Sequence, residues 1–576
     1  MLNTVIKSII FIPLHELLSL KQISTKKLAI QIITKMAFNN PSNQKTSIIS
    51  IIALLISMFS QTEVKSQNDY DIIIYGATSA GIVAAVESTR MEKSVLIIEP
   101  TNRIGGLTTG GLGATDIGNK IAIGGISREF YERIAEKYAS PDAWKWQKRE
   151  RPVKTKWTFE PKVAHEVFEE LISEHKIPIV LNERLDLTKG VIKNGGRIQS
   201  IIMESGKIFT AKVFIDASYE GDLMALAGIS YTVGRESNTA YGETLNGVQT
   251  KLAQYHQFPD HVDPYIVKGK PSSGLLPNVN IEPGAEGGSD KKVQAYCFRM
   301  CLTNVPENRI PFEKPEKYTE IEYELLFRAL EAGYKGPLFI MSKMPNGKTD
   351  SNNKGPFSSD YIGRNYNYPD GNYKTREKII EAHEIYQKGL LWTLANHPRI
   401  PKKIREEYST WGLPKDEFID YGHWTPQLYI REARRMVSDF VMTEHHCTQD
   451  SISANQSVGM GAYTMDSHHT QRYITEEGFV KNEGDVEVGG FSPYPISYKA
   501  LVPKKSECIN LLVPVCLSAS HMAFGSIRME PVFMVLGQSA AIAACLAIND
   551  QIPVQEIDYH QLKKILLSKG QVLSLK

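Results

Sequence analysis

The sequence predicts an α/β fold in which a parallel sheet covered by helices is interrupted by an inserted, mixed α+β domain. Three observations predict this class. A strand, a glycine turn, a helix and a second strand follow one another at 70–98. A further apolar strand and a long apolar helix occur at 510–548, and the segment between, from about 229 to 420, has few periodic runs. The sheet and helices that begin at 70–98 are therefore expected to continue near the carboxyl end of the chain.

The first unit has the pattern of a dinucleotide-binding motif. Residues 71–75 form a short run rich in β-branched side chains, typical of a buried parallel strand. Gly76 permits a sharp turn and Gly81 lets the helix approach the strand, while Thr78 stands where the middle glycine of the usual G-x-G-x-x-G pattern lies. The N–H groups at the start of this helix can bind a pyrophosphate. Glu99 follows the turn by roughly 20 residues, the spacing at which a carboxylate binds ribose hydroxyls.

A second glycine cluster, Arg103-Ile-Gly-Gly106, follows Glu99. NAD alone does not require a second backbone cradle at this point, whereas the longer ribityl-flavin arm of FAD does. We therefore predict non-covalently bound FAD, against the alternative of a βαβ unit with an incidental glycine loop. The expected cofactor-binding residues in this region are Gly76, Ala77, Thr78, Ser79, Ala80, Gly81, Glu99, Pro100, Arg103, Gly105, Gly106, Leu107 and Thr108.

Together with Ser526-Ile-Arg-Met-Glu-Pro531, these motifs resemble the FAD-dependent oxidoreductases related to glutathione-reductase-type and fumarate-reductase-type flavoproteins. The closer match is a bacterial branch that often accompanies polysaccharide-degrading systems and includes members labelled xanthan lyase. The resemblance spans about residues 70–550. It implies a Rossmann-type, glutathione-reductase-like FAD-binding domain with an inserted substrate domain, and it does not specify the substrate.

The resemblance also implies two further contacts with FAD. In such flavoproteins the chain returns to the nucleotide fold through a small-residue turn, which Ala217 and Ser218 match, while Asp222 caps the next helix or binds the cofactor. A carboxyl-terminal helix then points its N-terminus at the flavin pyrimidine and stabilises the anionic reduced ring. The residues placed there are Arg528, Met529, Glu530, Pro531 and Val532, with Pro531 suited to a first helical turn.

The length of 576 residues predicts two domains with extensions. The expected divisions are an N-terminal extension and signal peptide (1–66), a first FAD-binding segment (67–230), a substrate domain (231–420), a second FAD-binding segment (421–560) and a tail (561–576). An apolar core at 47–59 follows Lys45 and has the length of a signal peptide. We therefore expect an exported, periplasmic enzyme without a stable membrane span in the mature chain. An uncleaved N-terminal anchor is the alternative, and Met36 would make a more conventional start than Met1.

Composition and cysteine use exclude several classes. With 42% hydrophobic and 23% charged residues and a net charge of +2, the chain is neither disordered nor suited to nucleic acid.

The six cysteines include no C-x-x-C pair. Cys297 and Cys301 lie on an expected strand, roughly 13 Å apart, which predicts buried thiols and disfavours disulfide-reductase activity. Adjacent histidines in 445–447 and 468–469 point apart on regular backbone and lack spaced partners, so no metal site is predicted.

Polar residues of the expected substrate domain are candidates for sugar binding. The segments 348–353 and 359–363 combine carboxylates, amides and hydroxyls near tyrosines, and a sugar presents both hydroxyl groups and an apolar face. We single out Asn353, Asp360 and Tyr366. A solvated, turn-rich loop is the alternative.

An arginine cluster at 427–436 is the other candidate. If this segment is helical, Arg431 and Arg435 are i, i+4 neighbours with Arg434 close by, and together they could clamp a carboxylate. Alternatively, acidic neighbours or the FAD phosphates satisfy them structurally.

The predicted activity is hydride transfer between flavin N5 and a small polar substrate such as a sugar or uronic acid, with an undefined electron acceptor. His521, on the loop leading to the last long helix, is the first candidate for the base, with His446 second and Arg431 as a further catalytic residue. A flavin-dependent lyase or isomerase acting on a polysaccharide fragment is the alternative, and a flavin-binding protein without catalysis is a third.

Overall fold

The computed structural model describes residues 69–145, 155–449 and 452–575. The predicted signal peptide lies outside these residues. The compact unit described here begins at Tyr70.

A seven-stranded sheet forms the centre of the FAD-type domain, in the order β3-β2-β1-β6-β5-β4, with β23 also paired to β6. Strands β3, β2 and β1 are parallel, as predicted. The second half of β6 pairs in parallel with β23, which is how the carboxyl-terminal segment rejoins the sheet. The strands are β1 (Asp69–Tyr75), β2 (Val95–Ile98), β3 (Ile179–Val180), β4 (Val191–Asn194), β5 (Arg197–Ile202), β6 (Ile208–Asp216) and β23 (Leu511–Leu512).

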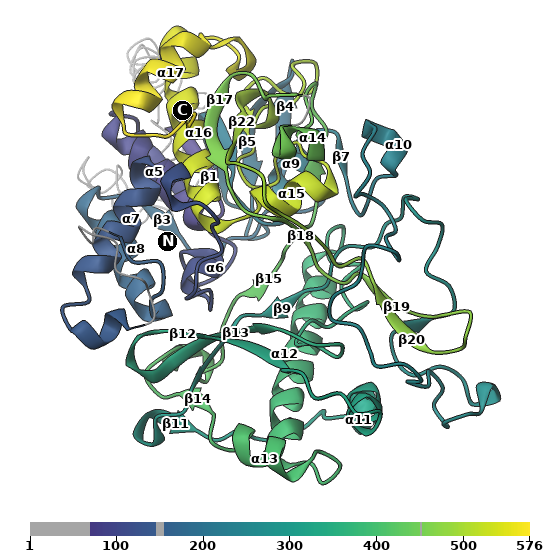
Figure 1. The fold of residues 1–576 in the computed structure, drawn as a ribbon. Coiled ribbons are helices and arrows are strands. Elements are labelled where there is room, and N and C mark those ends of the chain that lie inside the picture. The colour runs from purple at the N-terminus through teal and green to yellow at the C-terminus, as the bar shows by residue number, and fades with distance from the viewer. Residues whose placement is uncertain (1–68, 146–154, 450–451, 576) are drawn as a thin grey trace, which may run out of the picture. The chain divides into compact units, whose positions relative to one another are not determined.

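Side chains alternate between the two faces of this sheet, as strand geometry requires. Ile72 and Ile74 point into the core that the long helices cover, whereas Ile73 and Tyr75 point into the core on the opposite face. Helix α16 packs along α5, and Figure 1 shows the two side by side. The helices of the first core are α5 (Ser79–Arg90), α7 (Gly125–Glu136), α8 (Pro161–Glu174), α16 (Glu530–Asp550) and α17 (Tyr559–Ser568).

Among the described residues one helix, α16, is long and apolar enough to cross a membrane, but 94% of its most apolar window is buried within the fold. Close packing explains its composition. A Cβ on Gly537 would lie 2.3 Å from the carbonyl oxygen of Ala80. The core helix of a soluble protein has the same length and hydropathy.

A second core lies within the inserted region, around α12 (Tyr373–Asn396) and the antiparallel sheet β10-β13-β12. It also includes Leu428, Ile430 and Val480, which lie beyond the predicted boundary at 420. The other elements of this region are β8 (Val279–Asn280), β9 (Cys297–Phe298), β10 (Met300–Thr303), α11 (Glu324–Glu331), β12 (Phe339–Lys343), β13 (Lys348–Asn353), α13 (Lys402–Tyr408), β15 (Leu428–Tyr429), β19 (Gln471–Ile474) and β20 (Val480–Glu483).

Short elements complete the structure, and several of them contribute side chains to the first core. They are α6 (Gly106–Thr109), α9 (Asp222–Leu226), β7 (Tyr231–Thr232), α14 (Glu444–Thr448), β16 (Arg435–Met436), β17 (Ser457–Gly461), β18 (Met465–Ser467), β21 (Val486–Val488), β22 (Tyr494–Ser497) and α15 (His521–Ile527).

Two local predictions are wrong. The segment 427–436 is not a helix: it contains the short strands β15 and β16, which pair with β9 and β7. His521 does not lie on a loop but begins α15, which Ser520 caps. The cysteine prediction is confirmed, since all six thiols are free and buried.

Candidate flavin and substrate sites

The first glycine turn brings β1, α5 and the turn after β6 into close contact. Gly76 has a φ of +101°, and a Cβ there would lie 2.9 Å from the Ala217 backbone. A Cβ on Gly81 would lie 2.0 Å from the carbonyl oxygen of Gly76, so both positions require glycine. The Thr78 hydroxyl accepts a hydrogen bond from Gly81 N–H (3.3 Å) and donates to Ala217 O (2.8 Å). Thr78 thus caps the helix, which explains a threonine at the usual glycine position.

Glu99 lies beside this turn, at the end of β2. Its carboxylate accepts hydrogen bonds from Ala77 N–H (2.6 Å) and from the backbone and hydroxyl of Thr101 (2.8 and 2.6 Å). Burial raises the pKa of Glu99. Two carboxylate oxygens offer about four acceptor sites, so acceptor capacity remains for a ribose hydroxyl.

The second glycine cluster is joined to the first by a hydrogen bond from Gly105 N–H to Ala77 O (2.7 Å). Gly105 and Gly106 both have positive φ values, +88° and +51°. Arg103 donates from Nη2 to Thr109 O (2.9 Å), but its Nε is buried without a hydrogen-bond partner. A buried, unpaired guanidinium N–H beside two backbone cradles fits an anionic group such as a cofactor pyrophosphate.

A cavity lies between these groups. Predicted cofactor residues that line it are Gly76, Thr78, Glu99, Pro100, Arg103, Gly106, Ser218 and Asp222. Its volume of about 160 Å³ is smaller than the roughly 300–1,000 Å³ of most ligand sites. The residues present fit FAD, but only a portion of the cofactor would lie in this cavity.

The cofactor contacts predicted at the start of α16 do not line this cavity. Glu530 is buried and accepts hydrogen bonds from the hydroxyls of Ser79, Thr108 (2.8 Å) and Tyr219 (2.7 Å). It therefore ties α16 to α5 and α6. The other predicted cofactor residues, which line neither this cavity nor the pocket described below, are Ala77, Ser79, Ala80, Gly81, Gly105, Leu107, Thr108, Ala217, Met529, Glu530, Pro531 and Val532. Their contact with the flavin stays a prediction.

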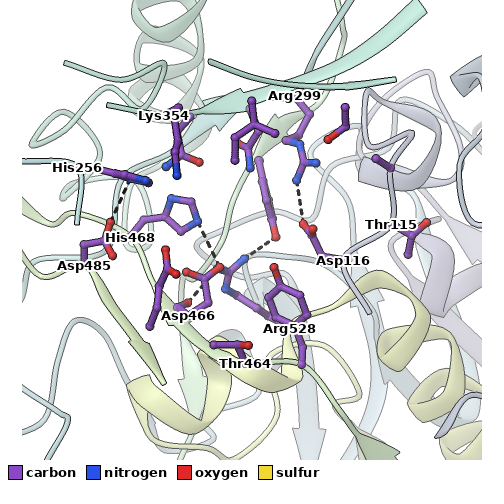
Figure 2. A pocket seen from close by; sticks show the side chains of 18 residues that line it. Thr115, Asp116, His256, Arg299, Lys354, Thr464, Asp466, His468, Asp485 and Arg528 are labelled. Carbon is purple, nitrogen blue, oxygen red and sulfur yellow. Dashed lines mark hydrogen bonds and ion pairs between the residues drawn. The ribbon is translucent and has the colours of Figure 1, made fainter. Parts of the chain in front are cut away.

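A second, larger pocket of about 450 Å³ is lined mainly by polar and charged side chains (Figure 2). We call it the polar pocket. Its walls come from both cores, including the segment after the second glycine cluster and Arg528, two residues before α16. Its lining residues are Ala114, Thr115, Asp116, His256, Arg299, Ile340, Ser342, Asn352, Asn353, Lys354, Tyr429, Tyr463, Thr464, Asp466, His468, Asp485, Glu487 and Arg528.

His468 is the best-oriented imidazole of the polar pocket. Its Nδ1 lies 2.8 Å from Asp360 Oδ2, and its Nε2 lies 3.5 Å from Asp466 Oδ2. Arg431 Nη2 in turn lies 2.9 Å from Asp360 Oδ1. Burial and Arg431 lower the pKa of His468, but Asp466 and Asp360 outweigh them and raise it. Arg431 and Asp360 thus fix an imidazole whose other nitrogen lies beside Asp466, a carboxylate that also lines the pocket.

The two histidines proposed as bases lie elsewhere. His521 Nδ1 is 2.7 Å from Glu432 Oε2 and its Nε2 is 3.0 Å from Ser467 Oγ, so both nitrogens are engaged. His446 Nδ1 accepts from Thr443 N–H (3.1 Å) and completes a capping box at α14. Neither histidine lines the polar pocket. Their catalytic roles stay predictions.

The predicted substrate residues are only partly brought together. Asn353 lines the polar pocket, and Asp360 lies behind it as the partner of His468. Tyr366 instead donates its hydroxyl to Thr470 O (2.7 Å).

The helical spacing expected for the arginine clamp does not form, because 427–436 contains strands, and substrate contact by these arginines stays a prediction. Arg434 Nη1 lies 2.7 Å from Asp222, which also binds Arg376. Arg435 is fully buried and pairs with Glu236 (2.6 Å) and Glu432 (2.7 Å). Arg434 and Arg435 therefore have structural partners, and Asp222 pairs with arginines while also lining the smaller cavity.

Sequence reasoning misses most of the polar pocket. The histidine pair at 468–469 stands out in the sequence and Asp466 lies two residues before it, but the other acidic partners, Asp360 and Asp485, come from other segments. The hydrogen-bonded charges around the pocket, such as Arg299 with Asp116 (2.9 Å) and Asp350 (2.7 Å), also join distant residues. No local spacing could have identified them.

The comparisons agree with this architecture. The model of the FAD dependent oxidoreductase family matches residues 71–566, so the chain belongs to this family, and FAD is its cofactor. Its parallel sheet is that of a Rossmann-type FAD domain. No curated protein matches the chain.

Solved flavoproteins are similar over smaller stretches. They include a flavin-containing monooxygenase from Stenotrophomonas maltophilia (14% identity, 30% of this chain and 44% of that chain, TM-score 0.18). A 3-ketosteroid-Δ4-(5α)-dehydrogenase from Rhodococcus jostii RHA1 has 12% identity over 37% of this chain and 64% of that chain (TM-score 0.21). An L-amino acid deaminase from Proteus vulgaris has 16% identity over 31% of this chain and 56% of that chain (TM-score 0.22). The chain thus spans less than two thirds of the length of each of these proteins.

Proposed function

We propose that this enzyme oxidises a small, polar, hydroxylated substrate such as a sugar or uronic acid in the polar pocket. The observation that carries the proposal is the lining of that pocket, where hydrogen-bonding and charged groups outnumber apolar ones. When bound, FAD supplies a hydride acceptor at N5. The electron acceptor that completes turnover is undefined.

The proximity of the polar pocket to the cofactor cavity supports this assignment. Leu428 lines the smaller cavity and the next residue, Tyr429, lines the polar pocket. The second glycine cluster likewise contributes Gly106 to the smaller cavity, and the chain after it leads to Ala114 in the lining of the polar pocket. A cofactor too large for the first cavity can therefore extend toward the second.

The pocket residues have distinct roles in this proposal. His468 takes the hydroxyl proton at Nε2, because Asp360 holds Nδ1 and fixes the ring. Arg528 and Lys354 offer donors for a carboxylate. Asn352, Asn353 and Thr464 offer neutral hydrogen bonds for hydroxyl groups.

A non-redox lyase or isomerase acting on a polysaccharide fragment is the second candidate. The side chains of the polar pocket also favour a lyase, since a positioned imidazole beside guanidinium groups could remove a proton next to a carboxylate. Anaerobic incubation of the holoenzyme with a panel of sugars and uronic acids separates the two. Oxidation bleaches the flavin, whereas elimination releases an unsaturated product and leaves the flavin oxidised.

We further propose, from the apolar core at 47–59, that the enzyme is exported to the periplasm, where polysaccharide fragments would be available. The resemblance to a branch that accompanies polysaccharide degradation supports the same substrate class.

A further inference from the structure

A cluster of two histidines and one aspartate lies at one end of the polar pocket, where Figure 2 shows His256 beside Asp485. His256 Nδ1 is 3.4 Å from Asp485 Oδ2, and His469 Nε2 is 3.5 Å from the same oxygen. One ligand atom from each residue lies within 4.8 Å of the others. Tetrahedral ligands at 2.0–2.2 Å from a zinc ion lie about 3.4 Å apart, so this spacing suits one metal ion.

The polar atoms of this cluster lack hydrogen-bond partners. Both ring nitrogens of His469, Nδ1 of His256 and Oδ1 of Asp485 are buried without one. His469 and Asp485 are 2% and 3% exposed. Buried polar groups are almost always hydrogen-bonded, and a bound ion is one of the few explanations for an exception.

Hydrogen bonds to their backbone carbonyl groups hold the two histidines in place. Asn482 Nδ2 donates to the carbonyl oxygen of His256 (2.9 Å), and Ala295 N–H donates to that of His469 (3.0 Å).

We propose that His256, His469 and Asp485 bind one divalent transition-metal ion, with an open coordination position facing the polar pocket. Two imidazoles and a carboxylate suit Zn²⁺, Fe²⁺ and Mn²⁺. His256 and Asp485 line the pocket, so a substrate hydroxyl or carboxylate oxygen can complete the coordination. Coordination by a substrate oxygen rests on the proposed function, whereas the metal site itself does not.

A second acidic cluster provides a contrast within the same chain. Glu160, Asp416 and Glu417 also lie close together. There, Nζ of Lys348 contacts all three carboxylates at 2.7, 2.8 and 2.7 Å. A protein cation already neutralises that cluster, and it carries no proposal.

The test uses holoenzyme stripped with a chelator, reloaded separately with Zn²⁺, Fe²⁺ or Mn²⁺ and desalted, with metal and FAD measured per chain. We expect about one ion per chain for at least one metal. His256→Ala and Asp485→Asn should weaken binding by at least about a hundredfold while FAD content is unchanged. The control is His560→Ala, an exposed histidine on α17, which should bind metal as wild type does.

X-ray absorption of the loaded wild-type protein avoids dependence on variant folding. We expect scattering from two imidazole rings. Retention of none of the three ions, wild-type affinity in both variants, or a metal shell without imidazole would overturn the site. None of these measurements requires turnover, so a failed search for a redox substrate would leave the metal result intact.

Discussion

Gly81 tests the cofactor site at the scale of one residue. A single methyl group at this position would lie 2.0 Å from the carbonyl oxygen of Gly76. Gly81→Ala should therefore force α5 away from the turn and move the N–H groups that bind the pyrophosphate. We expect the purified variant to retain less than about a tenth of the FAD per chain, measured by absorbance after denaturation.

Gly228→Asn is the matched control, because a Cβ at Gly228 meets nothing within 4 Å and asparagine tolerates its φ of +70°. It should retain full flavin. Wild-type flavin content in Gly81→Ala would show that this turn does not bind the cofactor.

His468 and His521 are rival bases, and one pair of variants separates them. His468→Gln should slow anaerobic flavin reduction by about a hundredfold, because a general base contributes roughly that much. His521→Gln should have the smaller effect, since Glu432 and Ser467 hold both nitrogens of His521 away from the polar pocket. Stopped-flow absorbance measures both rates at equal FAD content. A larger loss of rate in His521→Gln than in His468→Gln would identify His521 as the base, as the sequence suggests.

The two sites differ in how far sequence could predict them. The glycine turn, Thr78 and Glu99 lie within one βαβ unit, where spacing along the chain determines spacing in space. The polar pocket instead joins residues from Ala114 to Arg528. The role proposed for His468 depends on Asp360, 108 residues away, and no pattern in one sequence records that contact.

At the scale of elements, Gly537 sets the distance between α16 and α5. A Cβ there would lie 2.3 Å from Ala80 O. Gly537→Val should separate the helices and lower the melting temperature of the FAD-bound protein by about 1–3 °C, since overpacking costs about 1–3 kcal/mol. Asn549→Val, at an exposed position of the same helix, should change it by less than about 0.5 °C because Val and Asn have similar helix propensities. Equal melting temperatures would exclude close helix packing as the role of Gly537.

The strand–helix–strand unit β1-α5-β2 and the long apolar helix α16 were predicted correctly. The segment 427–436 was not. Its arginines satisfy a helical spacing, but each is bound by a carboxylate from elsewhere, such as Asp360 at Arg431 and Glu236 at Arg435. Buried ion pairs and strand pairing with β9 and β7 outweigh local helix propensity here.

At the scale of the whole molecule, the chain should lose its N-terminal segment on export. The apolar core at 47–59 and the polar run after it predict a mature N-terminus near Gln67. The sheet begins at Asp69, so this cleavage would leave the fold intact. Edman degradation of protein from the native host should recover that terminus. Recovery of Met36 or any earlier residue would contradict export by cleavage.

The class of reaction is also a property of the whole molecule, because it depends on both cores meeting around one pocket. If the substrate is oxidised, a saturating amount should bleach the flavin without oxygen, with one equivalent of product per FAD. Oxygen or an artificial electron acceptor should then restore the oxidised spectrum. A lyase would release unsaturated product, absorbing in the ultraviolet, in many turnovers without an acceptor. Flavin that stays oxidised while such product accumulates would refute hydride transfer and leave His468 as the base of an elimination.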